Sequence, residues 1–463
     1  MQFKNLNEII FKENTLVKDV LEQFNKTAIF TEQHGFGIVI DNQGICVGVI
    51  SDGDIRRKLL TGLTIDSPVS KALNTEYRFV FEGESSHSIL RLFDQKVANL
   101  PVLNTNKEPV DLYRLSDFKA SSRKGQRIIR ARVPMRISYS GGGTDMSYYI
   151  NHHPAAVLSS TITKFCTASV LVRSDKVIQI ISKDLGIEYQ ANSIENLKFG
   201  DKLDLIKSAI KIMQPEFGFD LETHSEVDAG TGLGGSSALT GSIIGALNQF
   251  RNEKQLDLYD IADLSYQSER LDLEISGGWQ DQYSTVFGGF NWIEFRKNEV
   301  IVNPLRINRE IILELKFNLM LFRFGGTHDS GKIQLNGIRD YNVSDKLKID
   351  NFAKMTDLAT EMKEALLKGK VKKFGDLLDI SWQLKKSINT KTSNQYVDEL
   401  YSYARSEGAL GGKVLGAGDA GYMLIYASPK YQRTIKDAFE KKGAKYESFD
   451  FNENGLEVWS TPR

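Results

Sequence analysis

The first part of the chain alternates apolar and polar residues in patterns that predict a helix, a hairpin and a second helix. Residues 17–24 carry apolar side chains at the spacing typical of a helix. Residues 37–41 and 47–50 are rich in β-branched side chains and are joined by an Asn-Gln-Gly turn, which predicts a β-hairpin. Residues 55–60 then begin a second helix. These elements amount to half of a small domain.

The same order of elements returns between residues 86 and 120. Residues 86–93 are helix-like, residues 100–103 and 109–113 are short strands, and Asp117 opens another helix. A repeated order of elements indicates two similar halves, so segment 1–120 is predicted to be one module built from an internal repeat.

A short basic segment separates this module from the rest of the chain. Residues 119–132 contain six basic residues and no acidic one, with Ser and Gly at the front. Such a run between two segments that are patterned like folded domains is typical of a linker, which we place at 121–130. Its positive charge is that of a solvated loop.

Charge and composition exclude several classes of protein. The 463-residue chain has 59 basic and 59 acidic side chains, so it lacks the net positive charge expected of proteins that bind nucleic acid or membrane surfaces. Cys46 and Cys166 are its two cysteines, and their separation argues against a disulfide framework or a structural zinc site. No signal peptide or membrane span is evident, so a cytoplasmic location is expected.

The chemistry-bearing residues begin beyond the linker, where an alternating strand over residues 133–140 runs into three glycines. Gly142 and Gly143 are followed by the polar pair Thr144 and Asp145. A strand that ends in this way places Asp145 at the mouth of a cleft. A glycine turn capped by Thr144 and Asp145 is the alternative for this motif alone.

A glycine-rich loop at residues 229–238 leads into a helix of small residues at 239–248. Glycines let backbone N–H groups close around phosphate oxygens, and the N-terminus of the helix adds its positive dipole end. The spacing and lysine of a Walker loop are absent. The loop is therefore predicted to hold phosphate, with one of its two serines available for Mg²⁺. The candidate residues are Gly230, Gly232, Leu233, Gly234, Gly235, Ser236 and Ser237.

Two further motifs follow. Residues 268–283 form a helix that breaks at paired glycines and presents Glu269 and Asp281 on either side of the break. A phosphotransferase needs one carboxylate for Mg²⁺ and one near the acceptor hydroxyl. Residues 411–426 form a second glycine loop, with Gly416 and Gly418, that feeds an apolar strand.

The N-terminal segment 1–120 resembles a tandem pair of CBS motifs, most strongly at residues 48–57. The resemblance implies that Ser51 and Asp54 hold an adenine nucleotide or a nucleotide-sugar, and that the pair regulates the chain or joins two copies into a homodimer. In the second copy Arg114 replaces the hydroxyl residue while Asp117 remains. The alternative is that Asp54 and Asp117 only cap helices.

The four later motifs, in this order, resemble the GHMP kinases, the family of galactokinase, homoserine kinase and mevalonate kinase. The resemblance covers 131–463 and implies a two-lobed kinase fold, with lobes at 131–315 and 316–463, behind the CBS module. The chain is thus expected to be an α/β and α+β multidomain protein that uses ATP and Mg²⁺.

The resemblance also assigns roles to the motif residues. Arg136 and Asp281 correspond to the catalytic arginine and aspartate, and Glu269 with Ser236 or Ser237 to the Mg²⁺ ligands. The sugar site falls on Asp145, Gly142, Gly143 and Thr144. The ATP site falls on Gly230, Gly232, Leu233, Gly234, Gly235, Ser236, Ser237, Gly416 and Gly418.

Some positions depart from the family pattern. Gly142 and Gly143 stand where galactokinases have Glu and His, which enlarges the pocket, removes a negative charge and suits a sugar that carries a phosphate. Asp228 replaces a proline, and Asp419 interrupts the last glycine loop, which puts ATP turnover in question. Lys164 and the turn 327–330 are candidates either for the distal phosphate or for a surface role.

Within the family, the motif combination looks most like the D-glycero-D-manno-heptose 7-phosphate kinases, which phosphorylate the anomeric hydroxyl on the way to nucleotide-activated heptose. Two alternatives stay open. One is a sugar-1-kinase acting on an unphosphorylated hexose or fucose-like sugar. The other is a catalytically silent protein that senses nucleotides.

Overall fold

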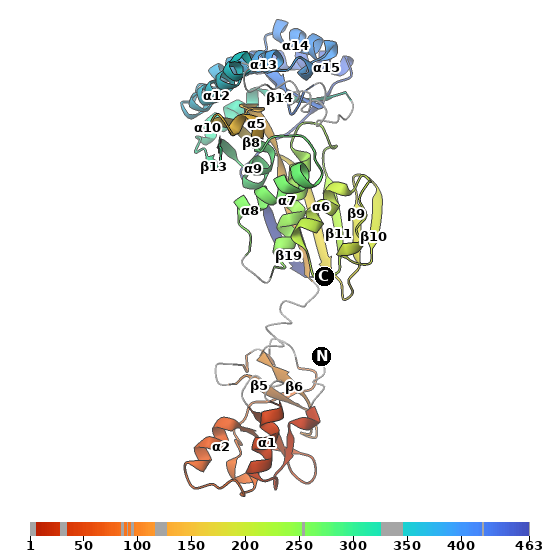
Figure 1. Cartoon of the computed structure of the whole chain (residues 1–463), viewed down its shortest axis with the longest axis vertical. Coiled ribbons are helices and arrows are strands. Elements are labelled where there is room, and N and C mark those ends of the chain that lie inside the picture. The colour runs from red at the N-terminus through yellow and green to blue at the C-terminus, as the bar shows by residue number, and fades with distance from the viewer. Residues whose placement is uncertain are drawn as a thin grey trace. The chain divides into compact units, whose positions relative to one another are not determined.

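The chain divides into two compact units, residues 1–125 and 126–463 (Figure 1). The computed structural model describes residues 6–27, 35–84, 88–89, 91–93, 97–115, 127–251, 255–325, 346–418 and 421–462. The helix predicted to open at Asp117 lies outside the described residues. Each unit is considered by itself below.

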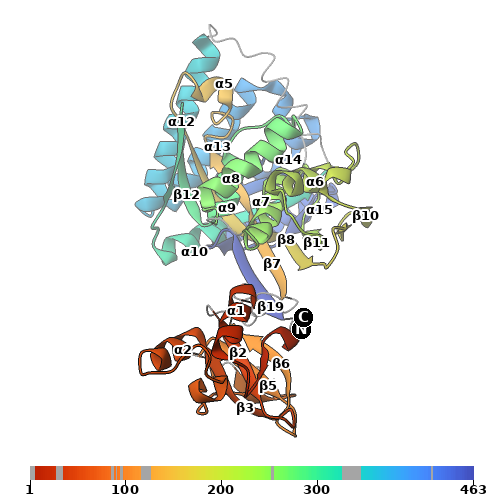
Figure 2. The same ribbon diagram turned by 60° about the horizontal axis from the view of Figure 1, so that its bottom comes forward.

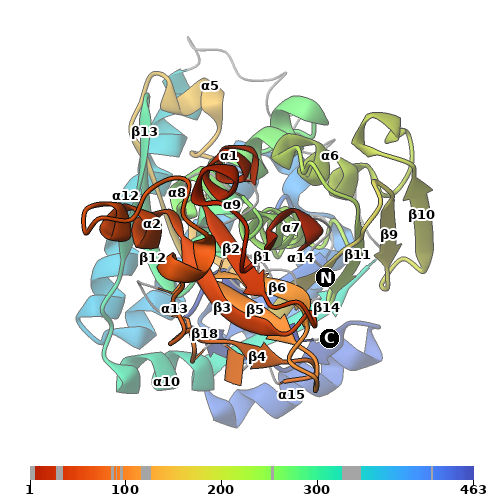
Figure 3. The ribbon, with the colours of Figure 1, turned by 90° about the horizontal axis from the view of Figure 1, so that it is seen from below.

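The first unit contains two three-stranded sheets with the same pairing, β1-β2-β3 and β4-β5-β6. In each sheet the first two strands are parallel and the last two form an antiparallel hairpin. The strands of the two sheets can be followed in Figure 3. Ile38 and Cys46 of one sheet pack in the same core cluster as Leu103 and Leu112 of the other. The predicted internal repeat is therefore confirmed. The elements are η1 (Leu6–Glu8), β1 (Ile10–Lys12), α1 (Val17–Thr27), β2 (Phe36–Ile40), β3 (Cys46–Ser51), α2 (Asp52–Leu59), η2 (Val69–Ala72), β4 (Val80–Phe81), β5 (Asn99–Leu103) and β6 (Pro109–Arg114).

The second unit is built on a nine-stranded sheet. Its long strand β8 pairs with β7, β11, β12 and β18, and β7 also pairs with β19. The strands are β7 (Arg127–Ser140), β8 (Ala155–Val172), β9 (Ile178–Ser182), β10 (Ile187–Ala191), β11 (Phe219–Ser225), β12 (Phe290–Arg296), β13 (Glu299–Pro304), β18 (Phe451–Asn452) and β19 (Glu457–Pro462).

Helices from the middle of the chain cover the long strands (Figure 2). Helix α7 is made of small and apolar residues and is buried over most of its length, which lets it lie close against β7 and β8. The helices of this region are α5 (Ser147–Ile150), η3 (Ile194–Asn196), α6 (Asp204–Met213), α7 (Gly235–Asn248), α8 (Leu258–Tyr266), the π-helical turn η4 (Gln267–Asp272) and α9 (Gln280–Phe287).

A second, four-stranded sheet of order β15-β16-β14-β17 forms the other lobe. Helices α12 to α15 gather around it at one end of the unit (Figure 1). Its elements are α10 (Arg309–Asn318), β14 (Leu319–Phe324), α12 (Lys346–Leu367), α13 (Val371–Ile388), η5 (Thr390–Thr392), α14 (Gln395–Ser406), β15 (Gly411–Val414), β16 (Gly421–Tyr426), α15 (Pro429–Lys441) and β17 (Lys445–Glu447).

Strand β7 runs from one hydrophobic core into another. Ile129 and Ala131 belong to the core beneath the large sheet, whereas Val133, Met135 and Ile137 belong to the core shared with the second lobe. A strand that is buried in both cores has its position fixed by packing on both sides. Its end, where the three glycines follow, therefore lies at the junction of the lobes.

Two predicted boundaries are corrected by the strand pairing. Residues 127–130, assigned to the linker, begin β7, because this segment pairs with β19 on one side and with β8 on the other. Residues 451–462, assigned to the second lobe, return to the large sheet as β18 and β19. The boundary between 315 and 316 falls inside α10.

None of the helices in the described part of the chain is both long enough and apolar enough to cross a membrane.

Candidate active site

The four glycine-rich motifs meet around one cavity of about 630 Å³ at the junction of the lobes. The end of β7 and the following turn line one wall, and the loop before α7 lines another. Turn 278–281 and the loop after β15 complete the cavity. The predicted residues that line it are Arg136, Gly142, Gly143, Asp145, Gly230, Gly232, Gly234, Gly235, Ser236, Asp281 and Gly416.

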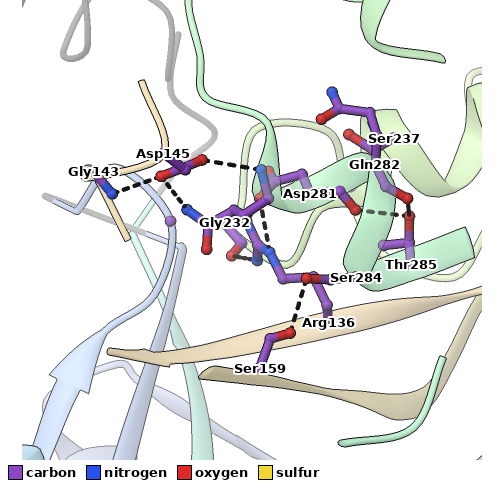
Figure 4. A network of polar contacts seen from close by, with 12 residues as sticks. Arg136, Gly143, Asp145, Ser159, Gly232, Ser237, Asp281, Gln282, Ser284 and Thr285 are labelled. Carbon is purple, nitrogen blue, oxygen red and sulfur yellow. Dashed lines mark hydrogen bonds and ion pairs between the residues drawn. The ribbon is translucent and has the colours of Figure 1, made fainter. Parts of the chain in front are cut away.

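Arg136 and Asp281 are joined directly (Figure 4). Arg136 is 3% exposed and donates from Nε and Nη2 to Oδ1 of Asp281, at 2.9 and 2.7 Å. Its Nη1 donates to the carbonyl oxygen of Gly232 at 2.5 Å. The guanidinium therefore fixes the Asp281 carboxylate against the glycine loop, and leaves Oδ2 of Asp281 without a contact from Arg136.

Asp145 is held in the turn by three hydrogen bonds. Its Oδ1 accepts from the backbone N–H of Gly143 at 2.9 Å and from Nε2 of Gln280 at 3.1 Å, and its Oδ2 accepts from the backbone N–H of Gln280 at 3.0 Å (Figure 4). Burial raises the pKa of Asp145, and the negative charge of Asp281 raises it further. A Cβ on Gly278 would lie 1.9 Å from Oδ2, so only glycine admits the carboxylate here.

The two glycine loops touch backbone to backbone. Gly416 has a φ of +63°, and a Cβ there would lie 2.4 Å from the Cα of Gly232. Gly232 has a φ of +87°, and a Cβ on it would lie 2.6 Å from the carbonyl oxygen of Leu415. The contact brings the loop after β15 onto the start of α7, whose first residue is Gly235, and Ser236 faces the cavity.

A buried network lies beneath the loop. Ser237 donates to Oε1 of Glu269 at 2.7 Å, and Nε2 of Gln282 donates to the same oxygen at 2.9 Å. Oε2 of Glu269 is buried without a hydrogen-bond partner, with Nη1 of Arg270 at 3.6 Å. Glu269 belongs to the π-helical turn η4, a distortion that recurs at functional sites.

Comparison with known proteins identifies the two lobes. Residues 204–289 match the model of the GHMP kinases N terminal domain, and residues 362–445 match that of the GHMP kinases C terminal. The D-glycero-alpha-D-manno-heptose 7-phosphate kinase of Campylobacter jejuni is 34% identical over 339 residues, which cover 72% of this chain and 99% of that enzyme. The chain belongs to the GHMP kinases.

Other proteins similar to this GHMP kinase are named as sugar kinases. A D-glycero-D-manno-heptose 1-phosphate kinase from Bacteroides thetaiotaomicron has a structure that matches with a TM-score of 0.60 at 28% identity, covering 72% of this chain and 98% of that chain. The Arabidopsis thaliana bifunctional fucokinase/GDP-fucose pyrophosphorylase is 27% identical over 65% of this chain and 30% of its own length. The chain is a GHMP-family sugar kinase, and therefore a phosphotransferase. GHMP kinases use ATP.

The first unit of this GHMP kinase carries a CBS domain, matched over residues 4–61. Ser51 is the N-cap of α2 and forms a capping box with Asp54: Oγ of Ser51 accepts from the Asp54 backbone N–H at 3.2 Å, and Oδ2 of Asp54 accepts from the Ser51 backbone N–H at 3.0 Å. Asp54 also pairs with Arg57. In this structure the two residues therefore cap the N-terminus of α2.

Five predicted residues of the GHMP kinase do not line the cavity. Thr144 is buried and donates its hydroxyl to the Gly141 carbonyl at 2.7 Å, which makes it a turn residue. Leu233 packs in the core, and its carbonyl accepts from the Arg136 backbone N–H. Ser237 and Glu269 lie in the buried network, and Gly418 packs against Thr392.

The structure also locates two of the residues whose roles the sequence left open, Asp228 and Lys164. Asp228 is exposed and forms an ion pair with Arg323 outside the cavity, so its charge is balanced. Lys164 pairs with Glu447 at 2.7 Å and does not line the cavity, which corrects its candidacy for the distal phosphate. Turn 327–330 and Asp419 lie outside the described residues.

Several basic residues of the GHMP kinase's cavity were missed from the sequence. Lys385 on α13 sits beside Lys386 in a polar stretch that resembles a solvated helix face. Lys413 lies inside a glycine-rich strand. Lys413 is buried and Lys385 is partly buried, no sequence pattern marks either of them, and the tertiary structure brings both to the cavity wall. The missed basic residues are Lys202, Arg270, Lys348, Lys385, Lys391 and Lys413.

Proposed function

We propose that this GHMP kinase transfers the terminal phosphoryl group of ATP to the anomeric hydroxyl of a sugar phosphate, D-glycero-D-manno-heptose 7-phosphate, giving the 1,7-bisphosphate. The observation that carries the proposal is the charge of the cavity. Among the described residues, seven basic side chains line it against two acidic ones, Asp145 and Asp281. This excess suits two substrates that both carry phosphate. The 34% identity to a heptose 7-phosphate kinase supports the choice of sugar.

The residues of the cavity account for the transfer. Asp281 takes the proton of the C1 hydroxyl as its oxygen forms a bond to the γ-phosphorus, and the bond to the β–γ bridging oxygen breaks with its electron pair left on ADP. Arg136 orients Asp281 through two hydrogen bonds. Asp145, fixed by Gly143 and Gln280, accepts hydrogen bonds from the ring hydroxyls of the sugar.

ATP and Mg²⁺ fit the remaining groups. The loop before α7 presents glycine backbone and the helix N-terminus to phosphate. Oε2 of Glu269 is a buried carboxylate oxygen without a hydrogen-bond partner among the described residues. Ser236 lies on the cavity wall and directly precedes Ser237, which donates to the other oxygen of Glu269. Mg²⁺ is commonly held by one or two carboxylates together with substrate phosphates, and bound here it would neutralise phosphate charge.

A kinase assay with a panel of acceptors tests the function. Heptose 7-phosphate is compared with free heptose, galactose and fucose under the same conditions. The proposal expects the highest kcat/KM for the sugar phosphate. A higher kcat/KM for any free sugar would refute it. A fucose-like acceptor is the second candidate, because a fucokinase is among the relatives.

A pair of substitutions at position 142 tests why the sugar phosphate is preferred. A Cβ on Gly142 would lie 3.2 Å from Nε2 of Gln280, so the neighbouring side chain must shift slightly to admit one. Gly142→Glu adds a negative charge that repels the phosphorylated acceptor, whereas Gly142→Gln adds nearly the same volume without charge. For each acceptor, the kcat/KM of Gly142→Glu is divided by that of Gly142→Gln. This ratio should be lower for the sugar phosphate than for the free sugar.

The CBS unit is proposed to regulate the kinase or to join two copies into a homodimer. Ser51 and Asp54 are the proposed contacts for an adenine nucleotide or a nucleotide-sugar, which requires a ligand to replace part of the capping box. Calorimetric titration of the full chain with AMP, ADP, ATP and GDP-sugars, repeated with Asp54→Ala, tests the ligand. Heat that is retained in Asp54→Ala would show that binding occurs elsewhere.

A further inference from the structure

Two lysines on the cavity wall have no acidic partner in the described part of the chain. Lys413 is 4% exposed, and its Nζ donates to the carbonyl oxygen of Tyr139 at 2.8 Å. Nζ of Lys385 donates to the carbonyl oxygens of Val414 at 3.1 Å and Gly416 at 2.6 Å. An ammonium group has three N–H donors, so one on Lys385 and two on Lys413 remain available.

The two lysines lie close enough to Arg136 for its positive charge to act on both. Lys385 bonds the carbonyl of Gly416, whose backbone touches Gly232. The carbonyl of Gly232 in turn accepts from Arg136, the partner of Asp281. This short series of contacts puts Lys385 beside the glycine loop at the Asp281 end of the cavity.

The charges of these groups are not balanced. Arg136 has Asp281 as its counter-charge. Among the described residues, Lys385 and Lys413 donate to backbone carbonyl oxygens and have no acidic partner, and Nζ of Lys385 also lies over the Trp382 ring at 5.8 Å. Desolvation, with a smaller effect from the positive charge of Arg136, lowers the pKa of Lys385 to about 7. Burial lowers the pKa of Lys413 as well, and Lys385 and Arg136 add to that effect. Because unpaired buried charge is costly, such a cluster is expected where a bound anion supplies the missing charge.

We propose that Lys385 and Lys413 are catalytic residues that, together with Arg136, hold the phosphoryl group in transfer from ATP to the sugar. During the transfer the acceptor oxygen bonds to the γ-phosphorus, the bridging oxygen leaves with its electron pair on ADP, and Asp281 takes the proton. The equatorial oxygens keep their negative charge throughout, and the two ammonium groups donate to them. The inference rests on the proposed phosphoryl transfer but not on the identity of the sugar.

Binding of nucleotides without a sugar gives the first test. Mg²⁺ with the imido analogue of ATP, which keeps a γ-phosphoryl group, is compared with Mg²⁺ and ADP by calorimetry on the full chain. Lys385→Gln should weaken binding of the analogue by roughly 10- to 100-fold, the effect of removing a hydrogen bond to a charged group, and leave ADP binding nearly unchanged. Equal losses for the two nucleotides would overturn the proposal.

The chain offers a matched control in the next residue. Lys386 lies on the same helix, bonds Asp398 at 3.0 Å and does not line the cavity. Lys386→Gln should bind both nucleotides as the wild type does. A loss in Lys386→Gln equal to that in Lys385→Gln would mean that α13 is merely disturbed, and the proposal would fail.

The phosphate of the acceptor is the other source of an anion, and steady-state kinetics separate the two. If the lysines hold the transferred group, Lys385→Gln lowers kcat for every accepted sugar alike, and Lys385→Arg restores part of it. A rise in KM for the sugar phosphate alone, with the ATP analogue bound normally, would assign Lys385 to the acceptor phosphate and overturn the proposal.

Melting temperatures settle whether a variant is folded. If both Lys385→Gln and Lys385→Arg fail to fold, Lys385 serves the structure and the proposal is wrong. The nucleotide test does not need a sugar. A wild-type chain that binds the ATP analogue through Lys385 but phosphorylates no heptose would therefore contradict the proposed function and leave the role of Lys385 standing.

Discussion

At the scale of single residues, the site depends on polar groups that are oriented by other polar groups. Arg136 donates three hydrogen bonds, two to Asp281 and one to the Gly232 carbonyl. One guanidinium group therefore fixes both the carboxylate and the glycine loop before α7. Asp281 keeps 20% of its side chain exposed and faces the cavity. A carboxylate that is fixed in this way needs little reorganisation when it takes a proton.

Asp281→Asn should lower kcat by roughly 10²–10⁴-fold, because a positioned general base contributes about that much. The amide still accepts from Arg136, so ATP affinity and melting temperature should change little. Steady-state kinetics check the rate. Asp228→Asn makes the same change in an ion pair outside the cavity and should leave kcat unchanged. A small change in kcat for Asp281→Asn would exclude it as the base.

Lys385 should make stability depend on pH. Its pKa of about 7 in the folded chain lies below the ordinary lysine value of 10.5, so between these values the unfolded chain binds more protons than the folded chain. The free energy of unfolding therefore rises with pH across this window. The stability that comes from keeping Lys385 neutral in the folded chain is lost as pH falls through about 7. The stability of the wild type relative to Lys385→Gln should increase from about pH 7 to about pH 10 in denaturant titrations. A difference that is flat with pH would contradict the lowered pKa.

At the scale of elements, the two glycine loops form one surface because neither carries a Cβ where they meet. Gly416 follows β15 and Gly232 precedes α7, so the contact joins the two lobes at the wall of the cavity. The end of β7, fixed between two cores, brings Arg136 to the same place. Loops held by two packed lobes are better positioned than a free glycine loop.

Gly416→Ala should weaken ATP binding and lower the melting temperature. The new Cβ meets the Gly232 backbone at 2.4 Å, so the loops must separate. Gly186→Ala is the matched control, since Gly186 has a φ of +65° and nothing within 4 Å of its Cβ position. Its free energy of unfolding should fall by about 1 kcal/mol, the cost of placing an alanine in the left-handed backbone region. Its ATP affinity should stay that of the wild type. Calorimetry on both variants checks the difference, and similar ATP affinities would argue against the loop contact.

At the scale of the whole molecule, kinase and CBS functions belong to different units. The Campylobacter jejuni relative is covered over 99% of its length by 72% of this chain, a share close to that of residues 126–463. The cavity lies entirely within that second unit. An effector at the CBS unit changes activity only if it binds two states of the chain with different affinity.

A chain that begins at Gln126 should fold, keep the wild-type kcat and lose any response to nucleotides at Ser51 and Asp54. A chain that begins at Val133 lacks residues 127–132, which pair with β19, and loses the ion pair of Arg132 with Glu457. It should melt at a lower temperature in scanning calorimetry. Equal melting temperatures would show that the β7–β19 pairing adds no stability, and an inactive but folded Gln126 chain would contradict the separation of functions.

The sequence by itself determined the repeat of the first unit, the family of the second and the eleven motif residues of the cavity wall, because turns, strands and glycine loops are specified by local chemistry. Arg136, Asp145 and Asp281 all stand next to such local signals. Only the tertiary structure decided that β19 pairs with the strand that begins in the predicted linker, and that the Thr144 hydroxyl bonds the Gly141 carbonyl and does not line the cavity. It also decided that Lys385 and Lys413 reach the cavity. The β7–β19 pairing and the placement of the two lysines depend on contacts between residues far apart in the chain, whereas Thr144 bonds Gly141 only three residues away. A lysine in a polar stretch looks the same in sequence whether packing leaves it in water or brings it to the wall of a cavity.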